Sequence, residues 1–367
     1  MRRCWPQQHS DPTRIRFLGP VCRSFNDGTL ASAWFALHSS PMSGEVDPQS
    51  PQTSAFHKLT PLAVAQFITQ GGRGATGMFQ ILNSYENRVY ALMMDDGSQL
   101  IGKFYRPGRW SDEAIIEEHQ FLAKLEDAGV LVAPPLDLPD GSTLGLIHGI
   151  RYALFERIPG REPQELDPDQ LERIGHDLAM IHSIGRNFHL RHRPVFTLDA
   201  WAETNLQFLL DHGTIPEEFE DAYEDAVDEL LDAISPLFVE LPVQPIHGDC
   251  HLGNLIWTHA GPYFLDFDDM VLGPPVQDIW LIAPSYDSDG VRQRQVLLDA
   301  YQCDAPFDSR QLDLVEPLRA LRFIHFSAWI ARRWSDPYFR HAFDYFGSAE
   351  YWRNEVADLH EQIRRIG

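Results

Sequence analysis

The sequence predicts an α+β fold with two lobes, a small lobe of sheet plus helix followed by a larger, mainly helical lobe. Strand-like segments and a turn signal fill residues 88–155, whereas apolar residues at helical spacing dominate after residue 160. The Pro159-Gly160 pair between these regions interrupts both patterns and suits a linker. We therefore expect an N-terminal lobe at residues 54–157 and a C-terminal lobe at residues 158–367.

Composition limits the class of protein. With 367 residues and 44% hydrophobic content the chain can bury a large core, and its longest apolar run is about half of the roughly 20 residues needed to cross a bilayer. The net charge of −23 disfavours nucleic acid as a partner, and we assign the acidity to solubility rather than to a cationic substrate. The cysteines form no C-x-x-C pair, so we expect neither disulfides nor structural zinc, and a reducing cytoplasm.

Residues 1–53 are expected to be a disordered extension. They are rich in Pro, Ser and Gln and lack sustained apolar periodicity. Their arginines give a superficial likeness to a transit peptide, but the segment has no signal-type apolar stretch and no clear cleavage pattern. We favour Met42 as an alternative start of the chain.

A β-hairpin is predicted early in the small lobe. Residues 88–94 and 100–105 are strand-like, and the turn signal Asp96-Gly97 separates them. This arrangement places Lys103 on the second strand.

A helix is predicted after the hairpin. Ser111 suits its N-cap, and its apolar pattern continues to about Ala128. Helical spacing places Glu118 in the middle of the apolar face and Glu117 away from it. A glutamate on an apolar face is costly to bury unless it is paired, so we expect Glu118 to have a cationic partner. The apolar face consists of Ala114, Ile115, Phe121, Leu122 and Leu125.

Helices are predicted to fill most of the larger lobe. Asp167 suits the N-cap of a helix with Pro168 in its first turn and Gly185 at its end. Further helices are expected near residues 200–210, 217–234, 293–301, 314–333 and 349–366.

The run IHGDCHLGN at residues 246–254, followed by FLDFDD at residues 264–269, indicates phosphoryl transfer. That chemistry needs a carboxylate to orient the attacking hydroxyl and oxygen ligands to hold Mg²⁺ against the phosphates of ATP. Asp249 is predicted to be the catalytic carboxylate, with Asn254 and Asp266 as the magnesium ligands. The step from Asp249 to Asn254 matches the H-x-D-x-x-x-x-N spacing of kinase catalytic loops.

Lys103 and Glu118 extend this kinase-like set. In kinases, a lysine on a strand pairs with a glutamate on the following helix, and this ion pair positions the phosphates of ATP. Lys103 and Glu118 occur in the same order and on the same types of element. The run His247-x-Asp249-x-His251 allows a second interpretation, a cluster of transition-metal ligands in a metallohydrolase. We prefer the kinase because a metallohydrolase leaves Lys103 and Glu118 unexplained.

The phosphate-binding loop is predicted at residues 83–89, where backbone N–H groups and the Ser84 hydroxyl can bind phosphate oxygens. A G-x-G-x-x-G pattern occurs at Gly72, Gly74 and Gly77. We interpret this pattern as a decoy because no hairpin adjoins it directly.

Three residues near the catalytic loop carry further expectations. Asp278 is expected to tie down the loop's backbone from a helix start, and His247 to brace it through hydrogen bonds. Gly248 stands where H-R-D motifs have an arginine that pairs with a phosphorylated activation loop. Only a short segment separates Asp266 from Asp278, so we predict that activity is not switched by phosphorylation there.

At these residues the sequence resembles the aminoglycoside and choline phosphotransferase superfamily and, within it, the bacterial stress response kinase A (RdoA) family. The likeness runs from about Ser54 to the C-terminus, and the extension before it has no counterpart. The motifs that carry it are NSYENRVY at residues 83–90, KFYRP at 103–107, EEHQF at 117–121, the loop at 247–254 and EPLRA at 316–320.

The resemblance implies a protein-kinase-like fold and a cytoplasmic, Mg²⁺- and ATP-dependent Ser/Thr protein kinase that autophosphorylates and acts in the stress response. It implies that Asp249 and Asp266 are the catalytic pair, that Asn254 and Asp266 bind Mg²⁺, and that Ser84 and Lys103 contact ATP. A small-molecule kinase of the aminoglycoside, choline or homoserine kinase type stays open as the alternative, because the superfamily shares its fold and motifs. An inactive nucleotide-binding scaffold is disfavoured because the set of residues is intact. We expect a monomer.

Overall fold

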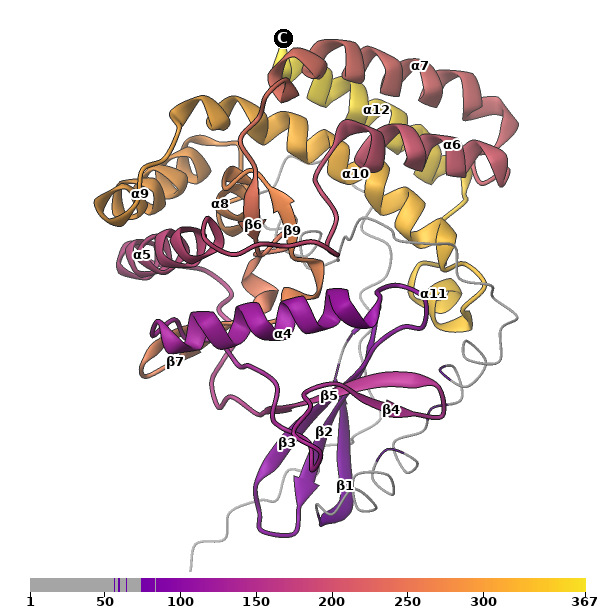
Figure 1. Ribbon diagram of the computed structural model, residues 1–367. Helices are drawn as coiled ribbons and strands as arrows, with labels where there is room; N and C mark the ends of the chain where they lie inside the picture. Colours follow the sequence, from indigo (N-terminus) through magenta and orange to yellow (C-terminus); the bar gives the residue numbers. More distant parts are fainter. Residues whose placement is uncertain (1–55, 57–58, 60–63, 65–73, 83) are drawn as a thin grey trace, which may run out of the picture.

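The structure is a computed structural model that describes residues 56, 59, 64, 74–82 and 84–367. The extension expected at residues 1–53, the alternative start at Met42 and Gly72 of the glycine-rich pattern lie outside the described residues. Within the described part, a twisted sheet and one helix lead into a larger set of helices (Figure 1).

The N-terminal sheet has five antiparallel strands in the order β1-β2-β3-β5-β4. Val89 pairs with Lys103, which confirms the predicted hairpin and places Lys103 on its second strand. Gly97 forms the turn with a φ of +83°, a conformation that favours glycine. The strands are β1 (Ala75–Leu82), β2 (Arg88–Met94), β3 (Gln99–Phe104), β4 (Gly145–Ile147) and β5 (Ile150–Glu156).

The helix α4 (Asp112–Asp127) lies between this sheet and the C-terminal helices (Figure 1). Ser111 caps it as predicted, because its side chain accepts a hydrogen bond from Ala114 N over 3.2 Å. The predicted apolar face is buried, and Glu118 is buried with it. Glu117 was predicted to point away from the apolar face, and the sequence predicted no partner for it. Its carboxylate is also buried, and it accepts hydrogen bonds there from the backbone N–H groups of Arg191 and His192.

Helices dominate beyond the linker, as predicted. α5 (Pro168–Gly185) begins with a reciprocal capping box between Asp167 and Gln170. α7 and α12 have the predicted bounds, whereas α9 begins at Ser288 rather than near residue 293. The remaining helices are α6 (Thr204–Asp211), α7 (Glu217–Ile234), α8 (Val276–Ile282), α9 (Ser288–Asp304), α10 (Val315–Arg332), α11 (Pro337–Ala342) and α12 (Ala349–Ile366).

Two small sheets that the sequence did not predict position the catalytic loop. β6 (Gln244–Ile246) pairs with β9 (Val271–Gly273), and β7 (Leu255–Thr258) pairs with β8 (Gly261–Phe264). Leu265 N donates to Asn254 O over 2.9 Å where β8 ends. The two sheets therefore bring residues 247–254 and 265–270 side by side.

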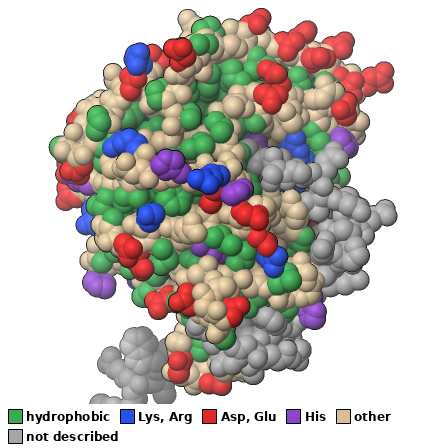
Figure 2. All heavy atoms as spheres, viewed as in Figure 1, with side chains coloured by type: hydrophobic (Ala, Val, Ile, Leu, Met, Phe, Trp, Pro, Cys, Tyr) green, Lys and Arg blue, Asp and Glu red, His purple; other side chains and the backbone are tan. Residues whose placement is uncertain are grey.

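Acidic side chains gather on the outer surface over α7 (Figure 2). Its first turn contains Glu217, Glu218 and Glu220, while Tyr223 and Leu230 on the other side are fully buried. No helix in the described part of the chain has the length and apolar character needed to span a membrane.

Candidate active site

Asp278, in the first turn of α8, holds the backbone of the catalytic loop as predicted. Its Oδ2 accepts from the N–H of His247 and its Oδ1 from the N–H of Gly248, each over 2.8 Å. Gly248 has a φ of +86°, and a Cβ at this position would lie 2.2 Å from the carbonyl oxygen of Asp269. The loop therefore has no room for the arginine that H-R-D motifs carry here.

Both histidines of the loop use their ring nitrogens in contacts with the loop itself or with the neighbouring residue Leu265. His247 accepts from Asp249 N at Nδ1 over 3.3 Å, and its Nε2 donates to Leu265 O over 2.9 Å. His251 accepts from Gly253 N at Nδ1 over 3.0 Å, so its Nε2 carries the hydrogen that faces Asp249. Neither ring directs a lone pair toward a shared metal position, which argues against the metallohydrolase interpretation.

The carboxylate of Asp249 is buried and is contacted on both oxygens. Arg322 Nη2 lies 3.0 Å from Oδ1, and His251 Nε2 lies 3.3 Å from Oδ2. The backbone carbonyl of Asp249 accepts from Asn254 Nδ2 over 2.9 Å. That hydrogen bond fixes the orientation of the Asn254 amide, so its oxygen is the atom offered to a cation.

Asp266 follows β8 in a left-handed backbone conformation, with φ of 58° and ψ of 65°. A non-glycine residue in this region is uncommon and is held there by its surroundings. Its side chain is 41% exposed, whereas that of Asp268 nearby is 2% exposed. Asp266 is therefore the carboxylate of this loop that a ligand can reach.

Lys103 joins the N-terminal sheet to this loop. Its Nζ lies 2.7 Å from Asp266, 3.4 Å from Asp268 and 3.6 Å from Glu118. Burial alone would lower the pKa of Lys103, but these three carboxylates hold that pKa well above its usual value. The predicted pair of Lys103 with Glu118 is thus present, although Lys103 lies closer to Asp266.

The segment predicted to bind phosphate is described from Ser84 onward, and Asn83 lies outside the described residues. It leads into β2, the strand that pairs with the Lys103 strand β3. Ser84 Oγ accepts from Asn87 N over 3.3 Å, and Asn87 Nδ2 donates to Asp268 over 3.1 Å. Gly77, from the pattern interpreted as a decoy, lies inside β1 rather than in this loop.

Sequence reasoning missed the residues that hold the loop after Asp266. Asp268 and Asp269 both pair with Arg109, which comes from the segment before α4. Burial alone would raise the pKa of Asp268, but Arg109 and Lys103 hold it well below its usual range. Asp268 and Asp269 could have been found from the sequence, because they belong to the same acidic run as Asp266. No local sequence pattern points to Arg109.

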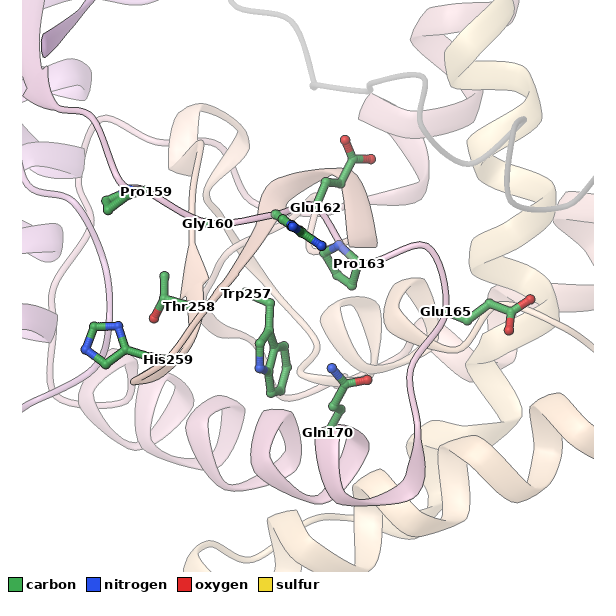
Figure 3. A pocket seen from close by; sticks show the side chains of 10 residues that line it. Pro159, Gly160, Glu162, Pro163, Glu165, Gln170, Trp257, Thr258 and His259 are labelled. Carbon is green, nitrogen blue, oxygen red and sulfur yellow. The ribbon is translucent and has the colours of Figure 1, made fainter. Parts of the chain in front are cut away.

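A cavity of about 420 Å³ lies beside the linker. Figure 3 shows the linker residues passing along the strand that carries Trp257 and Thr258. None of the residues predicted for catalysis lines this cavity, so it lies outside the candidate active site. Its lining consists of Pro159, Gly160, Arg161, Glu162, Pro163, Glu165, Gln170, Trp257, Thr258 and His259.

Known proteins share this sequence pattern. The model of a phosphotransferase enzyme family matches residues 79–315. The stress response kinase A of Escherichia coli K12 is 35% identical over 310 residues, which cover 84% of this chain and 94% of the relative. A protein of Salmonella typhimurium named serine/threonine protein kinase RdoA matches with the same identity and coverage.

Solved structures share the fold. An amicoumacin kinase in complex with AMP-PNP and Ca²⁺ matches with a TM-score of 0.65 and 18% identity, covering 82% of this chain and 93% of that one. A microcompartment-associated aminopropanol kinase matches with a TM-score of 0.63 and 18% identity, covering 83% and 98%. These likenesses, together with the sheet and helices described above, confirm the predicted α+β, protein-kinase-like fold.

Proposed function

Because the chain belongs to the phosphotransferase enzyme family and is a kinase, we propose that it transfers the γ-phosphoryl group of Mg-ATP to serine or threonine hydroxyls of proteins. The observation that carries this proposal is the 2.7 Å contact between Lys103 and Asp266. It joins β3, the strand before α4, to the loop that offers a reachable carboxylate. Asp249 and Asn254 belong to the loop that runs beside it.

Asp266 and Asn254 fit a magnesium ion. Mg²⁺ prefers carboxylate and carbonyl oxygens, and these two side chains offer one of each. The half-exposed Asp266 carboxylate and the fixed amide of Asn254 would hold it. When bound, the ion would neutralise charge on the ATP phosphates.

Asp249 and Lys103 take the two remaining roles. The acceptor hydroxyl oxygen forms a bond to the γ-phosphorus while the bond to the bridging oxygen breaks and ADP leaves. Asp249 orients that hydroxyl and accepts its proton. Lys103, supported by Glu118, places positive charge beside the phosphate oxygens, and Ser84 contributes its hydroxyl to them. Asp266 and Asp249 thus form the catalytic pair: Asp266 would hold the metal ion, and Asp249 orients the acceptor hydroxyl.

The proposal extends to the lobes and to the setting in which the enzyme acts. We assign residues 54–157 to the nucleotide-binding lobe and residues 158–367 to the lobe that carries the catalytic loop. The chain would act in the cytoplasm, as a monomer, with protein substrates and autophosphorylation. A role in the bacterial stress response is supported by the name of a relative with 35% identity over 84% of the chain.

A small-molecule kinase is the second candidate, since the solved structures with this fold include kinases named for amicoumacin and aminopropanol. The two candidates are separated by incubating the enzyme with Mg²⁺ and γ-labelled ATP, alone, with a generic protein acceptor and with a panel of amino alcohols and aminoglycosides. Phosphoserine or phosphothreonine that disappears in Asp249→Asn and Asp266→Ala supports the protein kinase. Label confined to a small molecule replaces it with the second candidate.

A further inference from the structure

The buried guanidinium of Arg193 connects two parts of the active site, α4 and the loop that follows Asp266. Arg193 lies in the irregular segment after α5, and its side chain has no exposed surface. Its Nη2 donates to Glu118 Oε2 over 2.8 Å, and its Nε donates to Ala114 O over 2.8 Å. Its Nη1 donates to the backbone carbonyl of Asp268. One side chain from the C-terminal lobe thus binds both α4 and the loop that follows Asp266.

The two oxygens of Glu118 are divided between two cations. Oε2 faces Arg193, while Oε1 lies 3.6 Å from Lys103 Nζ. If Arg193 were absent, a rotation of Glu118 away from Lys103 would cost less, because Oε2 would no longer be fixed. The ring of Trp110 packs against the guanidinium of Arg193, and its centroid lies 4.4 Å from the Arg193 Cζ. The orientation of Glu118 therefore depends on a residue outside its own lobe.

A second contact fixes α4 to the same segment. Glu117 accepts from the backbone N–H groups of Arg191 and His192 over 2.8 and 3.0 Å. Two consecutive glutamates of α4 thus bind three consecutive residues beyond α5. Displacing α4 would separate buried charges from their partners, which is costly. The residues between Asp266 and Asp278 include no serine, threonine or tyrosine, so a phosphorylated side chain in that segment cannot position α4.

We propose that Arg193 is a positioning residue for phosphoryl transfer: it orients Glu118 toward Lys103 and fixes the loop after Asp266 to α4. This inference rests on the proposed use of Lys103 in binding ATP phosphates. In the proposed mechanism Arg193 contacts neither ATP nor the acceptor hydroxyl. It acts through Glu118 and the carbonyl of Asp268. Its loss weakens nucleotide binding and slows transfer together.

The test compares Arg193→Gln and Arg193→Lys with a matched control, Arg294→Gln. Arg294 is also buried and donates to the backbone carbonyls of Ala283 and Ser285, away from the active site. The measurements are the Kd for AMP-PNP with Mg²⁺, the KM for ATP, kcat and the melting temperature. We expect Arg193→Gln to raise the Kd and the KM about tenfold and to lower kcat, with partial recovery in Arg193→Lys. Arg294→Gln should lower only the melting temperature.

A double-mutant cycle with Glu118→Gln distinguishes positioning from a general structural role. If Arg193 acts in part through Glu118, adding Arg193→Gln to Glu118→Gln raises the Kd by clearly less than the same substitution raises it in the wild-type protein. Fully additive changes overturn the inference, as does an Arg193→Gln variant that melts earlier but keeps the wild-type Kd and KM. If Arg193→Gln does not fold, Arg193→Lys carries the same comparison. A wild-type enzyme that does not bind AMP-PNP would instead contradict the proposed function.

Discussion

Arg322 donates a hydrogen bond from Nη2 to Oδ1 of Asp249 over 3.0 Å. It lies on α10, 73 positions after Asp249, and its side chain is 6% exposed. The proposed catalytic carboxylate is thus oriented by a cation from a distant helix. Gly248, next to Asp249, occupies the position of the arginine in H-R-D loops and has no space for one.

Arg322→Gln is expected to lower kcat by tenfold or more, with little change in the KM for ATP. The decrease in kcat should be about tenfold smaller than the decrease that follows removal of a general base. The reason is that Asp249 loses its orientation while the nucleotide contacts through Lys103 stay intact. Steady-state kinetics with varied ATP measures both parameters. Arg322→Lys should recover part of kcat. A raised KM with an unchanged kcat would assign Arg322 to nucleotide binding instead.

Gly248→Ala is expected to reduce the free energy of unfolding by about 2–6 kcal/mol, since a strained backbone and overpacking each cost about 1–3 kcal/mol. The new Cβ would meet the carbonyl oxygen of Asp269 at a positive φ. Gly141→Ala is the matched control, because Gly141 has a φ of +80° but no atom within 4 Å of its added Cβ. Chemical denaturation should show the smaller loss for Gly141→Ala; equal losses would contradict the close contact at Gly248.

Asp278→Ala is expected to reduce the free energy of unfolding by about 2–6 kcal/mol, because the N–H groups of His247 and Gly248 would be buried without acceptors. Asp278→Asn keeps one acceptor oxygen and should fall between this variant and the wild type. The loop that carries Asp249 should also become disordered. Denaturation and amide hydrogen exchange of residues 247–254 measure both effects, and unchanged exchange in Asp278→Ala would count against the role of this carboxylate.

Glu355 on α12 makes stability depend on pH. Burial raises the pKa of Glu355 to about 8, with a further contribution from Asp358, and Ser327 donates to its carboxyl over 3.0 Å. The folded state therefore retains the proton that the unfolded state releases near 4.5. The contribution of Glu355 to stability should be fully present below that value and fall by about 1.4 kcal/mol per pH unit until about pH 8. Glu355→Gln should flatten this slope in denaturation at several pH values; the same slope in both proteins would contradict it.

The parts of the candidate site that could be predicted from the sequence are those whose whole pattern lies in one short segment. The step from Asp249 to Asn254 and the place of Glu118 on the face of α4 both follow from local spacing. Arg109, Arg193 and Arg322 were not predictable, because they lie 73 to 160 positions from the acidic partners they bind. Only the packing of distant segments brings such pairs together.

The same limit applies to the fold. α7 and α12 have long amphipathic patterns, and their bounds were predicted correctly. β6 and β9 have three residues each, which is too short for an alternating pattern to appear. The burial of Glu117 was not predicted, because helical periodicity describes one buried face, and a second side of α4 is buried against residues beyond α5.

The most direct test of the central claim is single-turnover transfer from γ-labelled ATP by Asp249→Asn, with ATP binding measured in the same samples. If Asp249 orients the acceptor hydroxyl, the variant binds Mg-ATP within about twofold of wild type, and the transfer rate falls by about 100-fold or more. Transfer at the wild-type rate in a folded Asp249→Asn enzyme would contradict the assignment of Asp249 as the catalytic carboxylate.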